Sequence, residues 1–450
     1  MSSITARLAR FAVEAESRLP EDALAVAQLS LLDWAAVAIA GIEEPVSLMT
    51  RDLVADEGGA PQATVIGLSN RLPARAAAFA NGAVSHSLDY DDTHFSYVGH
   101  PSVAVIPAAL AIAERQNKDV AAFLRAALLG MEAACRVGHW LGAGHYNHGF
   151  HQTATSGAFG ATIAAGVLLD LDALAMQHAL GLVATRASGL KSQFGTMGKP
   201  YNAGIAAANG VEAALLAQKG FVSRPDGIEC AQGFAQTHAG ECGDIEASLA
   251  GLGEAFWFTT VQHKFHACCH GLHATLEAFA EIRSRNGPPA AEVDTVKIIT
   301  NPRWLLACNI DSPVTGLEAK FSYRLTAAMA LHGLPTGSLA VYSSENCERP
   351  DLVALRDRVL VEGDSAISDT AGKVIVTYLD GTQMAANADL NAPLSIRERH
   401  EKIVAKVQAL LPRESANTLV ALVDDRQDRL SADLAQRVSA LAFSTNPPKK

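Results

Sequence analysis

The sequence predicts a mainly α-helical protein, in which a large all-helical domain is interrupted along the chain by a smaller α+β domain. Apolar residues recur at helical spacing through roughly the first 260 residues, and strand-like alternation begins only after that point. From about residue 395 the helical spacing returns. We therefore expect one all-helical domain formed by residues 1–262 and 396–450, and one α+β domain formed by residues 263–395.

Apolar spacing or small residues mark each predicted helix of the first domain. The span Glu21 to Gly41 ends at a glycine, a common helix stop, and its apolar stretch is too short for a membrane span. Residues Ala154 to Leu169 are apolar on nearly all sides with small residues interleaved, which predicts a central helix. Further helices are expected over Ser102 to Arg115, Val120 to Val137, Leu171 to Thr185 and Ala203 to Lys219.

The middle of the chain predicts strands joined by helices. Asp294 to Thr300 alternates like a half-buried strand, and Lys373 to Leu379 does the same before the hairpin signal Asp380-Gly381. A third strand is expected near Val359 to Val361, with helices over Gly271 to Arg285 and Phe321 to His332. Beyond these, helices are expected over Arg397 to Leu411, Glu414 to Val423 and Leu430 to Leu441, followed by a disordered tail at 445–450.

Composition argues against several classes of protein. Hydrophobic residues make up 49% of the 450 residues, which is typical of a globular chain. The formal net charge of −11 disfavours nucleic acid as a partner, while a local basic pocket can still bind a small anion. The seven cysteines are odd in number and scattered, and no secretory signal or membrane span is recognisable. We expect a cytoplasmic protein with reduced thiols.

The most informative segment runs from His86 to His94 and continues through Gly99-His100-Pro101-Ser102. It concentrates carboxylates and imidazoles in a chain of which only 18% is charged. Burying such groups costs free energy unless they are paired or used, and a proton-transfer site would use them. Two other interpretations stay open, a divalent-metal or diphosphate site and a simple capped helix end with solvated carboxylates.

A second polar segment, His145 to Thr155, directly precedes the predicted central helix. A helix N-terminus carries free N–H groups and a positive dipole, which suit a carboxylate ligand. His151 lies at this end and is a candidate acid or base. The alternative is that Thr153 or Thr155 only caps the helix.

A third segment, Gly195 to Gly204, resembles part of a phosphate loop. The phosphate-loop pattern fails because Pro200 follows Gly198-Lys199, so nucleotide binding is not expected. Lys199 is better interpreted as a fixed cation for a substrate carboxylate, against the alternative of a solvated lysine.

Two more segments complete the set. His263 to His273 is dense in histidine and cysteine, which raises a zinc site or a catalytic thiol at Cys269 near Lys264. The ligand spacing fits no closed zinc site, so packing at a domain boundary is the third interpretation. Glu318 to Thr326 predicts a helix start with polar groups on one side.

Taken in order, these segments resemble the MmgE/PrpD family, which includes 2-methylcitrate dehydratases, cis-aconitate decarboxylases and iminodisuccinate epimerase. The resemblance covers nearly the whole chain and depends on three runs, Leu88-Asp89-Tyr90-Asp91-Asp92-Thr93 with Gly99-His100-Pro101-Ser102, Gly149-Phe150-His151-Gln152-Thr153, and Gly198-Lys199-Pro200. It implies a helical domain with an inserted α/β lid, a homodimer, and activity without a metal or organic cofactor.

The resemblance also implies a pocket between the domains. Lys199, Lys264 and His100 would hold substrate carboxylates, where charge develops. His151 would transfer the proton, with Asp89 as the second candidate. Thr93 would donate a hydrogen bond to substrate, and the remaining predicted substrate-binding residues are Tyr323 and Cys269.

Two departures from the family pattern weaken the decarboxylase interpretation. Many relatives carry a tyrosine two positions after Tyr323, where this chain has Leu325. Some decarboxylating relatives carry a histidine at the position of Cys269. The phenol and imidazole of those relatives are therefore absent or displaced here.

We therefore expect a cofactor-independent enzyme that abstracts a proton next to a carboxylate of a small di- or tricarboxylate. A hydro-lyase of the 2-methylcitrate dehydratase type is the first expectation. Within the family, the alternatives are an epimerase of an iminodisuccinate-like diacid and a cis-aconitate-type decarboxylase. Outside it, the alternatives are a zinc-dependent protein that uses the His263–His273 segment and a helical binding protein without activity.

Overall fold

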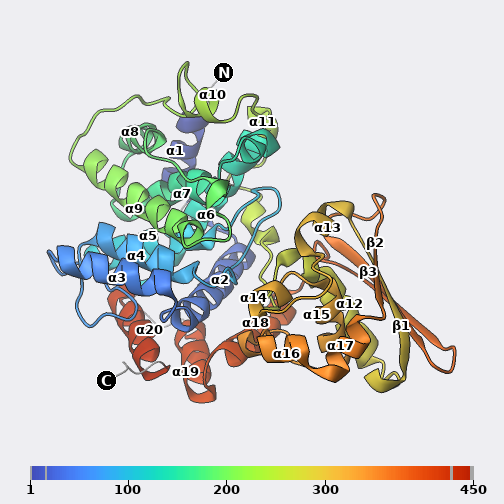
Figure 1. Ribbon diagram of the computed structural model, residues 1–450. Coiled ribbons are helices and arrows are strands. Elements are labelled where there is room, and N and C mark those ends of the chain that lie inside the picture. The colour runs from blue at the N-terminus through green and yellow to red at the C-terminus, as the bar shows by residue number, and fades with distance from the viewer. Residues whose placement is uncertain (1–2, 16–17, 426–428, 446–450) are drawn as a thin grey trace. The chain divides into compact units, whose positions relative to one another are not determined.

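The computed structural model describes residues 3–15, 18–425 and 429–445 (Figure 1). The chain forms two compact units, unit 1 from residues 1–263 and 411–450 and unit 2 from residues 264–410. Helices dominate, and the mainly α class is confirmed. The predicted disordered tail, apart from its first residue Thr445, lies outside the described residues.

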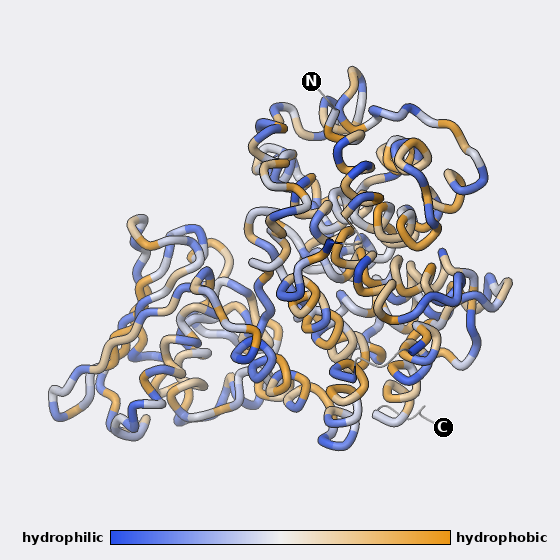
Figure 2. Tube along the Cα trace, turned by 180° about the vertical axis from the view of Figure 1, so that it is seen from behind, coloured by the Kyte–Doolittle hydropathy of each residue, from blue (hydrophilic) through white to orange (hydrophobic). Residues whose placement is uncertain are grey.

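Unit 1 is built around a central helix, α7 (Gln152–Leu168), in which every residue is buried. It packs against α5 (Ser102–Arg115), α6 (Val120–Asn147), α8 (Ala173–Ala184) and α9 (Gly198–Gln218). Small residues make this close packing possible, because a Cβ added at Gly130 of α6 would lie 2.5 Å from the Gly160 carbonyl oxygen of α7. In Figure 2, hydrophobic residues (orange) recur along the helices of unit 1.

The remaining helices of unit 1 surround this centre. Helix α2 (Glu21–Ala40) is long and apolar enough to cross a membrane, yet 78% of its apolar window is buried inside the protein, as in a core helix. The C-terminal α19 (Arg413–Asp424) and α20 (Ser431–Thr445) pack against α2. The others are α1 (Ile4–Glu14), α3 (Pro45–Glu57), α4 (Ala74–Ser85) and the short α10 (Phe234–His238) and α11 (Ile245–Ser248).

Unit 2 contains a four-stranded sheet in the order β2-β1-β3-β4. The strands are β1 (Val293–Thr300), β2 (Val359–Gly363), β3 (Ala371–Tyr378) and β4 (Gln383–Asp389). Strand β1 pairs in parallel with β2 and antiparallel with β3, and β3 and β4 form the hairpin expected at Asp380-Gly381. Strand β4 was not predicted, because its sequence QMAANAD has low strand propensity.

Helices cover this sheet. Helix α12 (His273–Ser284) packs against β3 and β4, and α15 (Tyr323–Leu331) packs against α12 and β2. The shorter helices are α13 (Pro302–Cys308), α14 (Gly316–Ala319), α16 (Ser344–Glu348) and α17 (Pro350–Arg356).

The second boundary between the units differs from the sequence-based expectation. Helix α18 (Ile396–Leu410) was expected in the all-helical domain, whereas the structure places it in unit 2 and the boundary at 410/411. The physical reason is a set of contacts made by Lys402, whose ammonium lies 2.6 Å from Glu277 of α12 and 5.0 Å from the ring centroid of Phe265. Helical periodicity predicts a helix but not the partner against which it packs.

Candidate functional site

The loop that joins α4 to α5 carries the acidic and imidazole groups of the site. His86 is the C-cap of α4, and the chain turns at Asp89, which has a left-handed φ of 50°. Aspartate tolerates this conformation better than most residues with a side chain, so the sequence suits the turn. The loop then closes on itself, with the His94 N–H donating to the Gly99 carbonyl at 2.9 Å, and delivers His100 to the start of α5.

Asp91 lies at the centre of the site and contacts two imidazoles. Its Oδ1 is 2.8 Å from His86 Nδ1, and its Oδ2 is 2.8 Å from His100 Nδ1. The rings of His86 and His100 meet edge to face with centroids 4.6 Å apart. All three residues are buried. Asp91 therefore contacts both rings at Nδ1, with hydrogen-bond geometry to His86 and a close charge contact to His100.

The pKa of each group follows from burial and its neighbours. Burial alone would raise the pKa of Asp91, but the charges of His86 and His100, together with the hydrogen bond to His86, outweigh it and hold that pKa well below its usual value. Burial lowers the pKa of His100 to about 4, although Asp91 opposes the shift. At neutral pH Asp91 is thus a carboxylate and His100 a neutral imidazole.

His151 is the third imidazole and occupies the N-cap of α7. Its backbone N–H donates to the Gly189 carbonyl at 2.9 Å, and its Nδ1 lies 3.3 Å from the Asn202 amide nitrogen. The ring stacks near His86, with centroids 6.0 Å apart, and meets Phe194 edge to face at 4.9 Å. Burial, followed by the charges of His86 and Lys199, lowers its pKa well below the usual value.

The capping alternative for this segment is not what the structure shows. No side chain caps α7. Thr153 instead accepts a hydrogen bond through Oγ1 from the His100 backbone N–H at 3.0 Å, and Thr155 contacts His145 Nε2 at 2.8 Å. The threonines therefore connect α7 to its neighbours, and Thr153 fixes the backbone of His100.

Lys199 brings a cation to the site. The predicted glycine-bounded loop is in fact the first turn of α9, which begins at Gly198. The Lys199 ammonium lies 2.5 Å from Asp89 Oδ2, while Asp89 Oδ1 is 3.6 Å from His100 Nε2. The Asp89 side chain is 46% exposed, so this end of the site faces solvent within unit 1. The structure thus brings together Asp89, His100, His151 and Lys199.

Two neighbours of these residues have other contacts. Thr93 is half-buried and pairs through its backbone with Gln262. Asp92 is buried beneath the loop and accepts hydrogen bonds from Ser102, at 2.5 Å from the hydroxyl and 3.3 Å from the backbone N–H. Burial raises the pKa of Asp92 to about 7, with Asp33 and Asp91 adding to the effect.

The three remaining predicted residues lie in unit 2. Lys264 is buried, and Cys269 is half-buried with its backbone N–H donating to the Lys320 carbonyl at 3.0 Å. Tyr323 is fully buried, and its hydroxyl donates to the Gly271 carbonyl at 2.7 Å and contacts Thr300 Oγ1 at 3.0 Å. These contacts favour a scaffold role for Tyr323 over the predicted substrate contact. The roles of Lys264 and Cys269 stay predictions.

One group of side chains has the composition of a metal site. His86, Asp89, Asp91 and His100 each offer one ligand atom within 4.8 Å of the others. Their protein partners already account for the cluster, since Asp89 has the ammonium of Lys199 and Asp91 has two imidazoles. Among the residues that the structure describes, the segment His263–His273 forms no comparable group, so the zinc interpretation gains no support.

Sequence reasoning named the site loop but not its organisation. His86 and Asp91 carried no assigned role, although the structure makes them the closest neighbours of His100. Their spacing of five residues across a helix end contains no signal for a shared carboxylate. Asn202 and Phe194 were also missed, because their contacts with His151 come from parts of the chain distant in sequence.

Comparisons with known proteins identify two family domains along the chain. The MmgE/PrpD N-terminal domain matches residues 6–243, and the MmgE/PrpD C-terminal domain matches residues 266–426. A cis-aconitate decarboxylase of Aspergillus terreus is 28% identical over 100% of this chain and 97% of its own length. The human cis-aconitate decarboxylase is 28% identical over 80% of this chain and 78% of its own. A cis-aconitate decarboxylase-like protein of Aspergillus oryzae, oryM, is 31% identical over 65% of this chain and 64% of its own length.

Proposed function

This chain belongs to the MmgE/PrpD family of enzymes, and we propose that it is a lyase that abstracts a proton next to a carboxylate of a small di- or tricarboxylate. The observation that carries the proposal is the cluster of His100, His151 and Lys199 around Asp89 and Asp91. Neutral imidazoles can accept or donate a proton, and a lysine ammonium can hold a carboxylate on which charge develops. Dehydration of a 2-methylcitrate-like hydroxy acid is the reaction that we put first.

Dehydration requires three chemical functions from this site. A base must take a proton from the carbon beside a carboxylate, a donor must hold the carboxylate oxygens as they gain charge, and the hydroxyl must leave with a proton. The buried imidazoles meet the first need because their lowered pKa values leave them unprotonated at neutral pH. Lys199 meets the second. The hydroxyl group leaves as water once it takes up a proton, and the imidazolium formed in the first step can supply that proton.

Decarboxylation of a cis-aconitate-like tricarboxylate is the second candidate. It is supported by the names of the relatives that align over most or all of this chain. Against it stand Leu325, where many relatives carry a tyrosine, and Cys269, where some decarboxylating relatives carry a histidine. The scaffold contacts of the Tyr323 hydroxyl also stand against it. The same cluster of imidazoles and lysine serves either reaction, since both generate negative charge next to a carboxylate.

The test is incubation of purified protein in D2O with 2-methylcitrate, citrate, cis-aconitate and aspartate-derived diacids, followed by proton NMR. An alkene formed with loss of water supports dehydration, and release of CO2 from cis-aconitate supports the second candidate. Deuterium that enters beside a carboxylate without an alkene identifies epimerisation instead. The variant His151→Asn should lose the reaction, whereas the exposed His148→Asn three residues earlier should keep it. A protein that processes no acid of this panel contradicts the proposal.

A further inference from the structure

We propose that the structure assigns opposite proton positions to two neutral imidazoles, making His100 the base through an unprotonated Nε2 and His151 a hydrogen-bond donor through Nε2–H. The inference rests on the proposed function for its catalytic meaning, but the proton positions themselves follow from the contacts of the two rings. It also assigns to Asp91 and Asn202 the role of positioning residues, each setting the tautomer of one imidazole.

The proton position of His100 follows from its contact with Asp91. A carboxylate only accepts hydrogen bonds, and a neutral imidazole has one N–H. His100 Nδ1 and Asp91 Oδ2 are 2.8 Å apart without the alignment of a hydrogen bond. A lone pair on Nδ1 would face the carboxylate at that distance, so the proton belongs on Nδ1 and Nε2 keeps its lone pair. Nε2 is 3.6 Å from Asp89 Oδ1, which is beyond hydrogen-bond distance and lies on a side chain that is 46% exposed. The lone pair therefore lies at the accessible edge of the site.

His86 keeps Asp91 in this orientation. Its Nδ1 is 2.8 Å from the second oxygen of Asp91, and its side chain has no exposed surface. With one oxygen on each imidazole, Asp91 cannot rotate without breaking a buried contact, which costs free energy. His86 thus acts on His100 through Asp91 and through the contact between the two rings, and it is a positioning residue rather than a catalytic one.

The proton position of His151 follows from its contact with Asn202. The Asn202 Nδ2 lies 3.3 Å from His151 Nδ1 and 3.4 Å from the Leu190 carbonyl oxygen. A carbonyl oxygen only accepts, so the amide nitrogen must face Leu190, and the same NH2 group then donates to His151 Nδ1. Nδ1 is consequently the acceptor of the neutral ring, and the proton is on Nε2.

These positions define the first chemical step. His100 Nε2 takes the proton from the carbon beside a substrate carboxylate, and the resulting imidazolium is paired with the Asp91 carboxylate. The electron pair of the broken C–H bond moves into the carboxylate, which becomes an enediolate. His151 Nε2–H and the Lys199 ammonium donate hydrogen bonds to its oxygens, where the charge develops. The step uses no group beyond the substrate and these side chains.

The first test measures the proton positions directly in the wild-type protein. Long-range proton–nitrogen correlation spectra of protein labelled with 15N-histidine distinguish the two tautomers, and the variants His100→Gln and His151→Gln assign the signals. At pH 7.5 we expect His100 protonated on Nδ1 and His151 protonated on Nε2. The opposite tautomer at either ring overturns the assignment. Because this measurement needs no substrate, it stands even where the proposed function fails.

The second test reverses each tautomer by exchanging the carboxylate of Asp91 for an amide and the amide of Asn202 for a carboxylate. Asp91→Asn gives His100 an amide that can donate to Nδ1, and by analogy with orienting carboxylates elsewhere kcat should fall about 10²- to 10⁴-fold with KM little changed. Since the charge of Asp91 raises the pKa of His100, the acid limb of the pH profile should also move to lower pH. Asn202→Asp gives His151 an acceptor at Nδ1, which removes the Nε2 donor and should lower kcat about 10²-fold.

A matched control separates this role from general damage to a buried carboxyl group. Asp92→Asn changes the next residue, which is equally buried but bonds to Ser102 rather than to an imidazole. It should keep kcat and the acid limb of the wild-type protein. Equal losses in Asp91→Asn and Asp92→Asn, or a loss in Asp91→Asn without a shift of the acid limb, would contradict a positioning role for Asp91.

Discussion

Asp91 and Asp92 are consecutive and fully buried, yet their carboxyl groups have opposite pKa shifts. Two imidazoles lower the pKa of Asp91 far enough to overcome burial. Asp92 has only the donors of Ser102, so burial raises its pKa to about 7, with the nearby charges of Asp33 and Asp91 adding to the effect. The pair shows that the partner, not the depth of burial, decides which carboxyl group ionises. Asp91 therefore supplies a negative charge to the site, and Asp92 belongs to the scaffold beneath it.

The raised pKa of Asp92 predicts a pH-dependent stability. In the unfolded chain this group ionises near its ordinary value of 3.8, and in the folded protein near 7. Between those values the folded protein binds more protons, so the stabilisation from Asp92 is greatest below about pH 4 and is lost as the pH rises to 7. The shift corresponds to a few kcal/mol at most.

Replacing Asp92 with asparagine should remove this dependence. Melting temperatures measured from pH 5 to pH 8 should fall more for the wild-type protein than for Asp92→Asn. The difference between the two curves isolates Asp92 from other buried acids such as Glu114, whose pKa burial also raises to about 7. If the melting temperatures of the two proteins instead change in parallel with pH, Asp92 ionises at the same pH in the folded and the unfolded chain, and the prediction is wrong.

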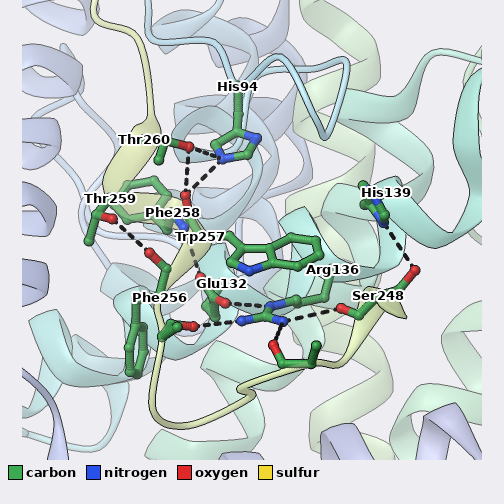
Figure 3. Close-up of polar contacts among 12 residues, drawn as sticks. His94, Glu132, Arg136, His139, Ser248, Phe256, Trp257, Phe258, Thr259 and Thr260 are labelled. Carbon is green, nitrogen blue, oxygen red and sulfur yellow. Dashed lines mark hydrogen bonds and ion pairs between the residues drawn. The ribbon is translucent and has the colours of Figure 1, made fainter. Parts of the chain in front are cut away.

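Arg136 holds the segment 250–257, which lies shortly before the chain enters unit 2 (Figure 3). Its loss should destabilise the protein strongly. It is fully buried, pairs with Glu132 at 2.6 Å and donates to the carbonyls of Ala250 and Ala255 at 2.6 Å each. Its guanidinium also lies 3.9 Å from the ring centroid of Trp257. Because Arg136→Met leaves a buried carboxylate without its cation, we expect a loss of about 3–5 kcal/mol.

A surface arginine provides the control for this variant. Arg186 pairs with Glu212 at 2.9 Å, but the side chains are 46% and 28% exposed. Exposed ion pairs contribute about 0–1 kcal/mol, so Arg186→Met should change little. Chemical denaturation followed by circular dichroism measures both. Similar midpoints for the two variants would mean that the network of Arg136 is not what stabilises this segment.

Lys199 should contribute mainly to substrate binding. Its ammonium pairs with Asp89 and its charge acts on His100, so Lys199→Met should raise KM about 10- to 100-fold for a dicarboxylate, with a smaller effect on kcat. Lys191 is a matched control, since its ammonium already donates to the Tyr146 carbonyl at 3.0 Å and lies over the Tyr146 ring. Lys191→Met should keep KM within about threefold. Steady-state kinetics in which Lys191→Met matches Lys199→Met would remove the special role of Lys199.

Helical periodicity predicted most of unit 1, because its long helices have strongly apolar faces. Helix α5 was predicted with its observed bounds, Ser102–Arg115, and α2 to within one residue at its end. Helix α6 runs past the predicted end at Val137, and beyond a kink at Gly142, whose φ of 68° is not helical, helical residues continue to Asn147. A glycine in sequence signals a stop and a kink equally well.

The site was less predictable than the helices that carry it. Clustering of acids and histidines pointed to the loop at 86–102, because such a concentration is costly without partners. The choice of partner depends on distances in space. Nothing in the sequence distinguishes Asp91, which binds two imidazoles, from Asp92, which binds a serine. Likewise, Asn202 contacts His151 although the two are 51 positions apart in the sequence, and only the packing of α7 on α9 reveals the contact.

Tyr323 offers the clearest separation between a structural and a catalytic role. Tyr323→Phe removes the hydroxyl that contacts Gly271 and Thr300, so stability should fall by about 1–2 kcal/mol. Since both contacts lie inside unit 2, kcat/KM should stay within about threefold of the wild-type value. Tyr342→Phe is the matched control, because that buried hydroxyl donates to the Thr336 carbonyl at 3.1 Å in the same unit. If Tyr323→Phe instead lowers kcat at least a hundredfold while its melting temperature follows that of Tyr342→Phe, the phenol takes part in the reaction and the scaffold role is wrong.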